Sequence, residues 1–391
     1  FGINMMDTLM LGRLGDSIIS AANLAGQPFF IFTILTYGIA GGASVLASQY
    51  WGKGDVATVR KIIAIALRIS MVFSVLFGLL VLCVPEMIMR IYTGDPVIVA
   101  YGADYLRIVG YIYFFFGLSN TYVSSIRSME IVGISVVSNI ITFLLNVIFN
   151  AIFIFGLLGA PALGIKGAAI GTLIARIAEF CVLTVYALWI DKRLCFRIRD
   201  LLTGNKTLLR DFLHYSLPVA LNELMWALGT SIQAMIFGRI GETAVAANSI
   251  AGVVQQLATI TIFGIANAAA VMVGKSVGAG DIHRTKQSAF TLTMVSIVIG
   301  LCSATLIFLV RNTVVDFYNV SAEAKELARE MLVVTAIIVF FISLSALFIV
   351  GVLRGAGDSR FNLDAVADQC AAWYRCGAAA EAAGTACISV F

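Results

Sequence analysis

Long apolar runs, separated by short breaks that contain charged residues, glycine or proline, recur along the whole chain. Several of these runs exceed the roughly 18 residues that distinguish a membrane-spanning helix from a buried helix of a soluble core. The pattern therefore predicts a partial helix followed by nine fuller spans. We place them near residues 1–12, 21–50, 62–85, 104–126, 131–158, 163–190, 213–238, 250–274, 288–310 and 331–353.

The composition supports a membrane protein. Hydrophobic residues make up 60% of the chain and charged residues 12%, against about 45–50% and about 25% in soluble domains. The seven cysteines form no CxxC pair, which argues against a disulfide framework or a metal site, and we expect no cofactor. The net charge of +4 does not indicate a nucleic-acid partner, because basic residues of membrane chains concentrate in cytoplasmic loops. The lipid bilayer is the expected environment of an all-α, multi-pass protein.

The basic residues also predict the orientation of the spans. Alternate loops differ in Lys and Arg content, and the richer set, which includes Lys53, Arg193, Lys275 and Arg354, is expected on the cytoplasmic side. The longest polar stretch, residues 191–211, belongs to this set and is the candidate linker between two halves.

The two halves share an internal repeat. At a constant offset of 226 residues, DTLMLGRLGDSIISAANLAG aligns with QAMIFGRIGETAVAANSIAG, and WGKGD aligns with VGAGD. Two copies that begin in the same orientation each need an even number of helices. We therefore predict two pseudo-symmetric six-helix lobes, covering residues 1–190 and 212–391 on either side of the linker. A substrate site between such lobes, near the bilayer midplane, is the natural expectation; a duplicated scaffold without transport activity is the alternative.

The same segments resemble the multidrug and toxic compound extrusion (MATE) family. The residues that carry the resemblance are MDTLMLGRLG, GGASVLASQYWGKGD, LRIVG, LLNVIFNAIFIFG, GAAIGTLIARIAE, SLPVALNELMWALGTS, IFGRIG, VGKSVGAGD and GVLRGAGDSR. The resemblance implies a bacterial inner-membrane antiporter of two six-helix lobes. Its V-shaped cavity would open alternately to each side and exchange H⁺ or Na⁺ for organic cations. We expect it to act as a monomer.

The chain departs from the family pattern at both ends. The repeat places a counterpart of Pro218 about eight residues before Phe1, so we expect the first helix to begin upstream of the printed sequence. After Arg360 the family pattern continues with two apolar helices, whereas residues 361–391 are rich in alanine and interrupted by charges. We expect these last two helices to be missing or aberrant, as a shifted or truncated reading frame would make them.

Asp7 is the leading candidate for ion coupling. It lies in an apolar run, where a charge costs at least about 2.5–3.5 kcal/mol on insertion scales. Asn139, Asn146 and Asn150 recur at helical spacing and are expected on one face. The resemblance implies that Asp7 is the proton or Na⁺ site of the first lobe, contacted by Asn146, Asn150 and the hydroxyl of Thr172. Asn150 stands where some members carry aspartate, which weakens a Na⁺ site. The alternatives are an interfacial aspartate and plain interhelical hydrogen bonding.

Glu223 is the candidate for cation binding in the second lobe. It follows Pro218 by five residues, with Asn222 beside it and Trp226 nearly one turn on. A carboxylate beside an aromatic ring attracts organic cations. The predicted binding site for a substrate or cation therefore consists of Glu223, Asn222, Trp226 and Asn139. The resemblance implies a role for the acidic position in this helix, and Ser343 stands where the sodium-coupled branch carries an acid, which favours protons. The alternative is a structural glutamate paired to a neighbouring helix.

Two further features limit the functional choices. Arg176 and Glu179 lie one turn apart and are expected to pair with each other. Only two histidines occur, His214 and His283, and we find no nucleophile, metal or phosphate-loop motif, which argues against an enzyme. The competing functions are a flippase for lipid-linked oligosaccharides, which would favour a basic cavity, and a nonfunctional fragment.

Overall fold

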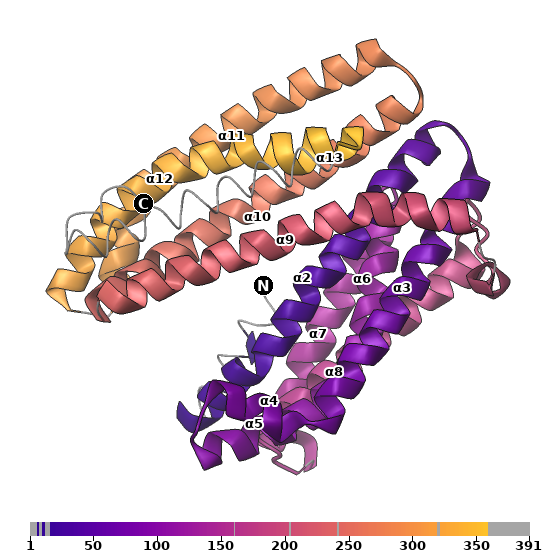
Figure 1. Cartoon of the computed structure of the whole chain (residues 1–391). Coiled ribbons are helices and arrows are strands. Elements are labelled where there is room, and N and C mark those ends of the chain that lie inside the picture. The colour runs from indigo at the N-terminus through magenta and orange to yellow at the C-terminus, as the bar shows by residue number, and fades with distance from the viewer. Residues whose placement is uncertain are drawn as a thin grey trace. The chain divides into compact units, whose positions relative to one another are not determined.

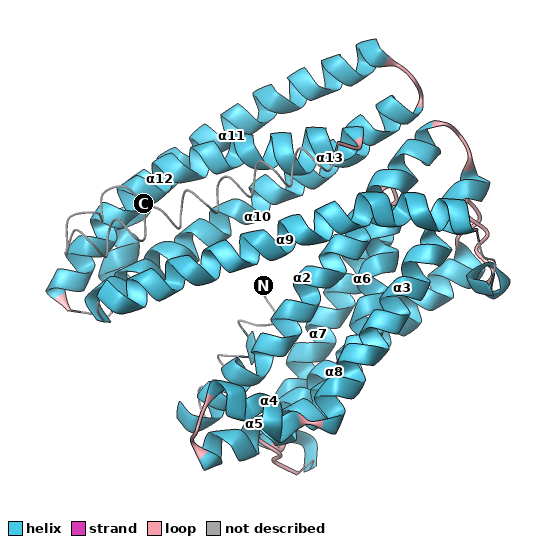
Figure 2. Cartoon of the chain, in the orientation of Figure 1, coloured by secondary structure: helices cyan, strands magenta, loops and turns pink. Residues whose placement is uncertain are grey.

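The computed structural model describes residues 6–7, 10–11, 16–159, 161–202, 205–240, 242–318 and 321–358. Within these ranges the chain is helical and contains no β-strand (Figures 1 and 2). The longer helices of the first half are α2 (Asp16–Gly52), α3 (Val56–Cys83), α4 (Pro85–Tyr92), α5 (Pro96–Val109), α6 (Ile112–Arg127), α7 (Gly133–Phe155) and α8 (Ile165–Val185). Those of the second half are α9 (Lys206–Ile240), α10 (Glu242–Gly278), α11 (Ile282–Phe317) and α12 (Ala322–Ala346), with the short α13 (Arg354–Ala356).

Four short segments within the described ranges have 3₁₀ or π-helical instead of α-helical geometry. Two are 3₁₀ turns, η1 (Leu157–Gly159) and η3 (Ile198–Leu202), and two are π-helical, η2 (Tyr186–Ile190) and η4 (Leu347–Leu353). Because η2 and η4 continue α8 and α12 without a break, the spans run to Ile190 and Ala356.

The described part of the chain divides into two compact units. One comprises the described residues up to Ala47 and those of Val56–Ser216, and the other comprises Ser48–Asp55 and the described residues from Leu217 onward. The division falls within α9, after Ser216, and the last residues of α2 group with the second unit. In the first unit α8 packs against α5, α6 and α7, and in the second α12 packs against α10 and α11.

The repeat extends to the helix boundaries. Each of α2, α3 and α5 begins 226 residues before the matching helix, α10, α11 or α12. The turn between α2 and α3 also matches the turn between α10 and α11. Gly54 and Gly280 in these turns adopt left-handed backbone angles with φ of 76° and 73°, which glycine tolerates without strain. Asp281 then caps α11, its side chain accepting the backbone N–H of Arg284 at 2.9 Å.

The halves differ where the first contains helix breakers. Pro85 separates α3 from α4, whereas Arg311 occupies the matching position inside the continuous α11. Proline lacks the N–H that an uninterrupted helix requires, so the chain turns there. Similarly, α5 and α6 meet at a bend of 51° near Gly110, while α12 runs straight through the equivalent position, Ala336.

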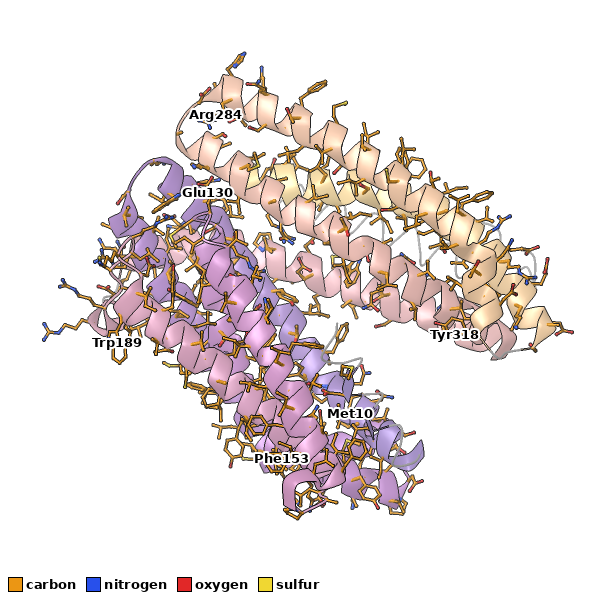
Figure 3. The ribbon with its side chains drawn as sticks, turned by 180° about the vertical axis from the view of Figure 1, so that it is seen from behind. Met10, Glu130, Phe153, Trp189, Arg284 and Tyr318 are labelled. Atoms are coloured by element: carbon orange, nitrogen blue, oxygen red, sulfur yellow. The ribbon has the colours of Figure 1, made fainter. Side chains whose placement is uncertain are left out.

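Large apolar side chains cover the outside of the helices. Along α3, Leu76 and Leu80 are 61% and 54% exposed, and such a surface is suited to lipid. Figure 3 shows Glu130 and Trp189 toward one end of the first unit and Phe153 toward the other. Loops two spans apart therefore share one side, as the alternation of basic residues predicted. Trp189, 79% exposed at a helix end, is typical of a membrane interface.

Nine of the predicted spans coincide with described helical segments; the span near 1–12 lies mostly outside the described residues. Within the described ranges, seven helices, or eight with the bent α5 and α6 pair counted as one span, are long and apolar enough to cross a membrane. The ninth segment, α9, is helical as predicted but is not among them, since polar residues such as His214, Asn222 and Glu223 interrupt its apolar sequence.

Candidate functional site

A row of polar side chains crosses the interior of the first unit. The Asn150 amide donates through Nδ2 to Asp7 Oδ1 and, at 3.4 Å, to Asn146 Oδ1. Asn146 Nδ2 in turn donates to Thr172 Oγ1 at 3.0 Å, and this hydroxyl donates to the Ala168 carbonyl at 3.0 Å. The four residues that the resemblance implies for ion coupling therefore form one connected network.

The network exists because α7 presents a polar face to its neighbours. The buried residues of α7 recur every three or four positions and include Ser135, Ser138, Thr142, Asn146 and Asn150. Both asparagines are fully buried, as amides within an apolar bundle must be if they are to find partners. Gly171 of α8 lies directly against Asn150, where a side chain would overlap the asparagine. The glycine lets α7 and α8 approach closely enough to form the row.

An ion pair lies one turn further along α8. Arg176 Nη1 contacts Glu179 Oε2 at 2.7 Å, with the side chains 16% and 7% exposed. The guanidinium also lies over the ring of Phe116, 4.9 Å from its centroid. The predicted pairing is confirmed, and the glutamate compensates the charge of this arginine inside the unit.

Asn139 does not join the buried face of α7. Its side chain is exposed, although the spacing to Asn146 predicted a shared face. The buried position near this level belongs to Ser138. The interpretation of one amide face therefore needs correction, because helical periodicity does not specify which part of a face a neighbouring helix covers.

In the second unit, Glu223 is paired. Arg354 Nη2 of α13 donates to Glu223 Oε1 of α9 at 2.9 Å. Asn222 is buried, and Trp226, nearly one turn on, is 45% exposed. The contact matches the interpretation of Glu223 as a glutamate paired to a neighbouring helix, and it leaves 25% of the glutamate side chain exposed.

Arg354 is the residue that sequence reasoning missed. The loop assignment of this arginine was wrong, because it lies in a helix and only 8% of the residue is exposed. The available signal was its position directly after the apolar run 331–353, with no polar residue between.

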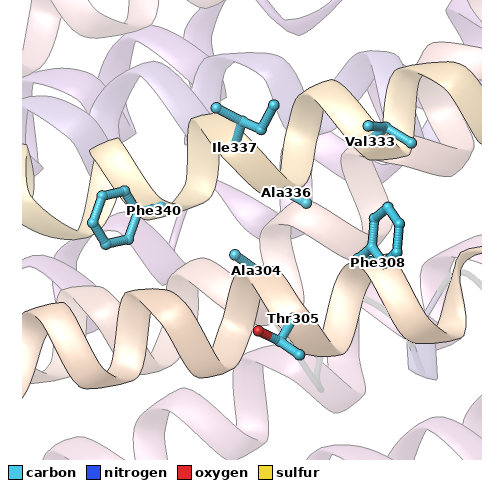
Figure 4. Close-up of a pocket in the computed structure, with 7 residues that line it drawn as sticks. All are labelled: Ala304, Thr305, Phe308, Val333, Ala336, Ile337 and Phe340. Carbon is cyan, nitrogen blue, oxygen red and sulfur yellow. The ribbon is translucent and has the colours of Figure 1, made fainter.

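The described part of the second unit also contains a groove. The groove in Figure 4 lies between α11 and α12 and is lined by Ala304, Thr305, Phe308, Val333, Ala336, Ile337 and Phe340. It includes none of the predicted site residues and has an almost wholly apolar lining. Among the described residues, no group of three His, Cys, Asp or Glu side chains could hold a metal ion.

Several predicted elements lie outside the described residues. They are Gly12, Arg13 and Gly15 of the first glycine motif, Gly241 of the second, Gly204 of the linker, and the tail after Arg360.

Curated proteins similar to this chain are named as multidrug resistance proteins. "Probable multidrug resistance protein NorM" of Rhizobium meliloti (strain 1021) is 25% identical over 375 residues, covering 91% of this chain and 77% of the relative. "Probable multidrug resistance protein YoeA" of Bacillus subtilis (strain 168) is 24% identical, covering 85% and 72%. "Multidrug resistance protein MdtK" of Photorhabdus laumondii is 23% identical, covering 92% and 78%.

Solved structures show the same fold. A crystal structure of a variant of the Vibrio cholerae MATE transporter VcmN superposes with a TM-score of 0.86 at 18% identity, covering 93% of this chain and 82% of the other. The structure described as "Outward-facing conformation of a multidrug resistance MATE family transporter of the MOP superfamily" superposes with a TM-score of 0.84 at 20% identity, covering 93% and 80%. The all-α, two-lobed architecture predicted from the repeat is confirmed.

The family comparison extends across both halves. The family model described as MatE matches residues 1–152 and 218–366, which together are more than half of the chain. Its two segments contain Asp7, Asn146 and Asn150 in one and Glu223 and Arg354 in the other. With its multi-pass helical fold, the chain belongs to the MatE family of membrane transporters.

Proposed function

We propose that this protein is an antiporter of the bacterial inner membrane that exports small, largely cationic organic molecules in exchange for protons. Support for the transported class comes from the names of the relatives, which describe multidrug resistance proteins. Support for the coupling ion comes from the residues of the two units. We expect the protein to act as a monomer in the lipid bilayer.

The observation that carries the proposal is the contact between Asp7 and Asn150. The ionised carboxylate accepts the amide Nδ2, and among the described residues the amide Oδ1 is buried without a partner. Protonation of Asp7 would convert one carboxyl oxygen into a donor. A half-turn of the Asn150 amide would then present Oδ1 to accept that proton. The same pair of side chains can therefore satisfy both protonation states inside an apolar bundle.

The partners of Asp7 favour a proton over Na⁺. Metal cations of this kind favour several oxygen ligands, often carboxylates. Residue 150 is an asparagine, whereas the resemblance implies an aspartate there in some members, so Asp7 is the one carboxylate of this four-residue network. In the second unit, Ser343 occupies the position at which the resemblance implies an acid in sodium-coupled members. Its hydroxyl is buried and donates to the Ser296 carbonyl at 2.8 Å. Asn150 therefore adds no second carboxylate beside Asp7, and Ser343 adds none in the second unit.

Glu223 supplies the cation-binding component. Its carboxylate is partly exposed, and Trp226 presents an exposed indole on the same side of α9, three residues on. An organic cation could thus meet a negative charge and an aromatic face together, a combination that stabilises such cations. Asn222, next to Glu223 on α9, completes the proposed set in the second unit.

The experiment is ethidium efflux measured in everted membrane vesicles. A proton gradient should drive efflux by the wild-type chain, and a sodium gradient at constant pH should not. Asp7→Asn should abolish gradient-driven efflux, because asparagine cannot release a proton. Asp95→Asn is the matched control, since Asp95 is an exposed helix cap and asparagine caps equally well. Full efflux by Asp7→Asn, or efflux driven by sodium alone, would contradict the proposal.

A further inference from the structure

The Glu223 and Arg354 pair brings a fixed positive charge to the proposed cation site. Arg354 begins α13, and the next residue, Gly355, lies against the backbone of Ala270 in α10, where a side chain would not fit. This close approach fixes α13 on α10 and directs the arginine toward α9. The guanidinium remains protonated under all physiological conditions, so the negative charge of Glu223 is compensated before any other cation arrives.

The contact is nevertheless limited in strength. One guanidinium nitrogen, Nη2, meets one carboxylate oxygen at 2.9 Å. Arg354 Nε is buried and has no hydrogen-bond partner among the described residues, so the pair lacks the two parallel hydrogen bonds of a bidentate arginine contact. The Glu223 side chain is also the more exposed partner, at 25% against 9%. A second cation can therefore approach the carboxylate from its exposed side.

We infer that Arg354 is the resident cation of Glu223, and that a transported organic cation binds by taking its place on the carboxylate. This inference rests on the proposed function. Because Arg354 stays charged when displaced, it competes continuously for Glu223. The arginine thus weakens cargo binding and promotes release on the delivery side.

The consequence can be expressed as a change in affinity. The apparent affinity of a ligand falls in proportion to the fraction of protein in the binding-competent state, so a pair closed about nine-tenths of the time weakens binding about tenfold. Removing Arg354 should therefore raise the affinity for the transported cation about tenfold and slow the release of that cation. A residue that only supported the fold would weaken binding and transport together.

Ethidium binding to the purified full chain in nanodiscs tests the inference. Arg354→Gln should bind ethidium about tenfold more tightly than wild type and show a lower maximal efflux rate, whereas Arg354→Lys should stay near wild type. Glu223→Gln should bind ethidium weakly, and adding Arg354→Gln to it should change nothing further. Binding of uncharged Nile red should be equal in all variants. Unchanged or weaker ethidium binding by Arg354→Gln, or a gain that persists without Glu223, would overturn the inference.

A second measurement uses the unaltered chain, in case the substitution impairs folding. Phenylglyoxal, which modifies accessible arginines, should react with Arg354 several-fold faster when ethidium is bound. Equal or slower modification would overturn the inference. Failure of the proposed function is distinguishable, because the wild-type chain would then neither bind nor export ethidium; export that is insensitive to Arg354 would remove this inference alone.

Discussion

Replacing Gly171 with alanine is expected to separate α7 from α8 at the Asp7 site. An ideal Cβ at this position would lie 2.8 Å from the Asn150 backbone nitrogen, 3.1 Å from the Phe149 carbonyl carbon and nearer still to Asn150 Oδ1. Real Cβ atoms essentially never approach within 3.0 Å of such neighbours. Because two of these atoms belong to the backbone, a change of side-chain rotamer cannot relieve the overlap, and the helices must move.

The magnitude follows from three effects. Overpacking a close contact costs about 1–3 kcal/mol, and loss of an interhelical hydrogen bond in a membrane protein costs about 0.6 kcal/mol on average. Alanine returns up to about 1 kcal/mol through its higher helix propensity. The free energy of unfolding should therefore fall by about 0.6–3.6 kcal/mol. The efflux rate should fall further than the loss of folded protein alone explains, since Asn150 moves away from Asp7.

The assay pairs reversible unfolding in mixed micelles with proton-driven ethidium efflux. Gly26→Ala is the matched control, because a Cβ on this helical glycine of α2 would have no atom within 4 Å, and the substitution should be neutral or slightly stabilising. If Gly171→Ala unfolds like Gly26→Ala and keeps full efflux, the close packing of α7 and α8 does not position the coupling group.

Two further substitutions test neighbouring parts of the account. Asn150→Asp places a second carboxylate beside Asp7, which favours a bound cation; vesicle assays should show efflux that a sodium gradient can drive, and continued indifference to sodium would argue against the role given to Asn150. Glu179→Gln leaves the largely buried Arg176 without a countercharge, so unfolding measurements should show a loss of about 3–5 kcal/mol. The double variant with Arg176→Gln should recover part of that loss, and a purely additive result would mean that the two side chains do not interact.

The sequence predicted the helices well where hydrophobic pattern and repetition agreed. The offset of 226 residues recurs in the first residues of α2, α3 and α5 and of their counterparts. At the turn before α3 and α11, both copies keep the same glycine and aspartate. The breaks at Pro85 and near Gly110 are confined to the first half. The repeat alone would have made the two halves alike, and the breaks near Pro85 and Gly110 distinguish their helices.

The candidate site was only partly predictable. The resemblance implied the contacts among Asp7, Asn146, Asn150 and Thr172, and hydrogen bonds join these side chains in the structure. The exposure of Asn139 could not be deduced, since it depends on where the neighbouring helices lie. The pair of Glu223 and Arg354 joins residues 131 positions apart, and no local pattern specifies which helices meet at that distance.

Proton movement during transport tests the central claim most directly. The purified chain would be reconstituted in liposomes that contain a pH-sensitive dye, and ethidium would be added outside at constant sodium concentration. The account predicts that ethidium entry causes proton efflux from the liposomes, and that Asp7→Asn abolishes this proton movement while Asp95→Asn preserves it. An undiminished pH change in Asp7→Asn, or ethidium uptake with no proton movement in the wild-type chain, would contradict the account.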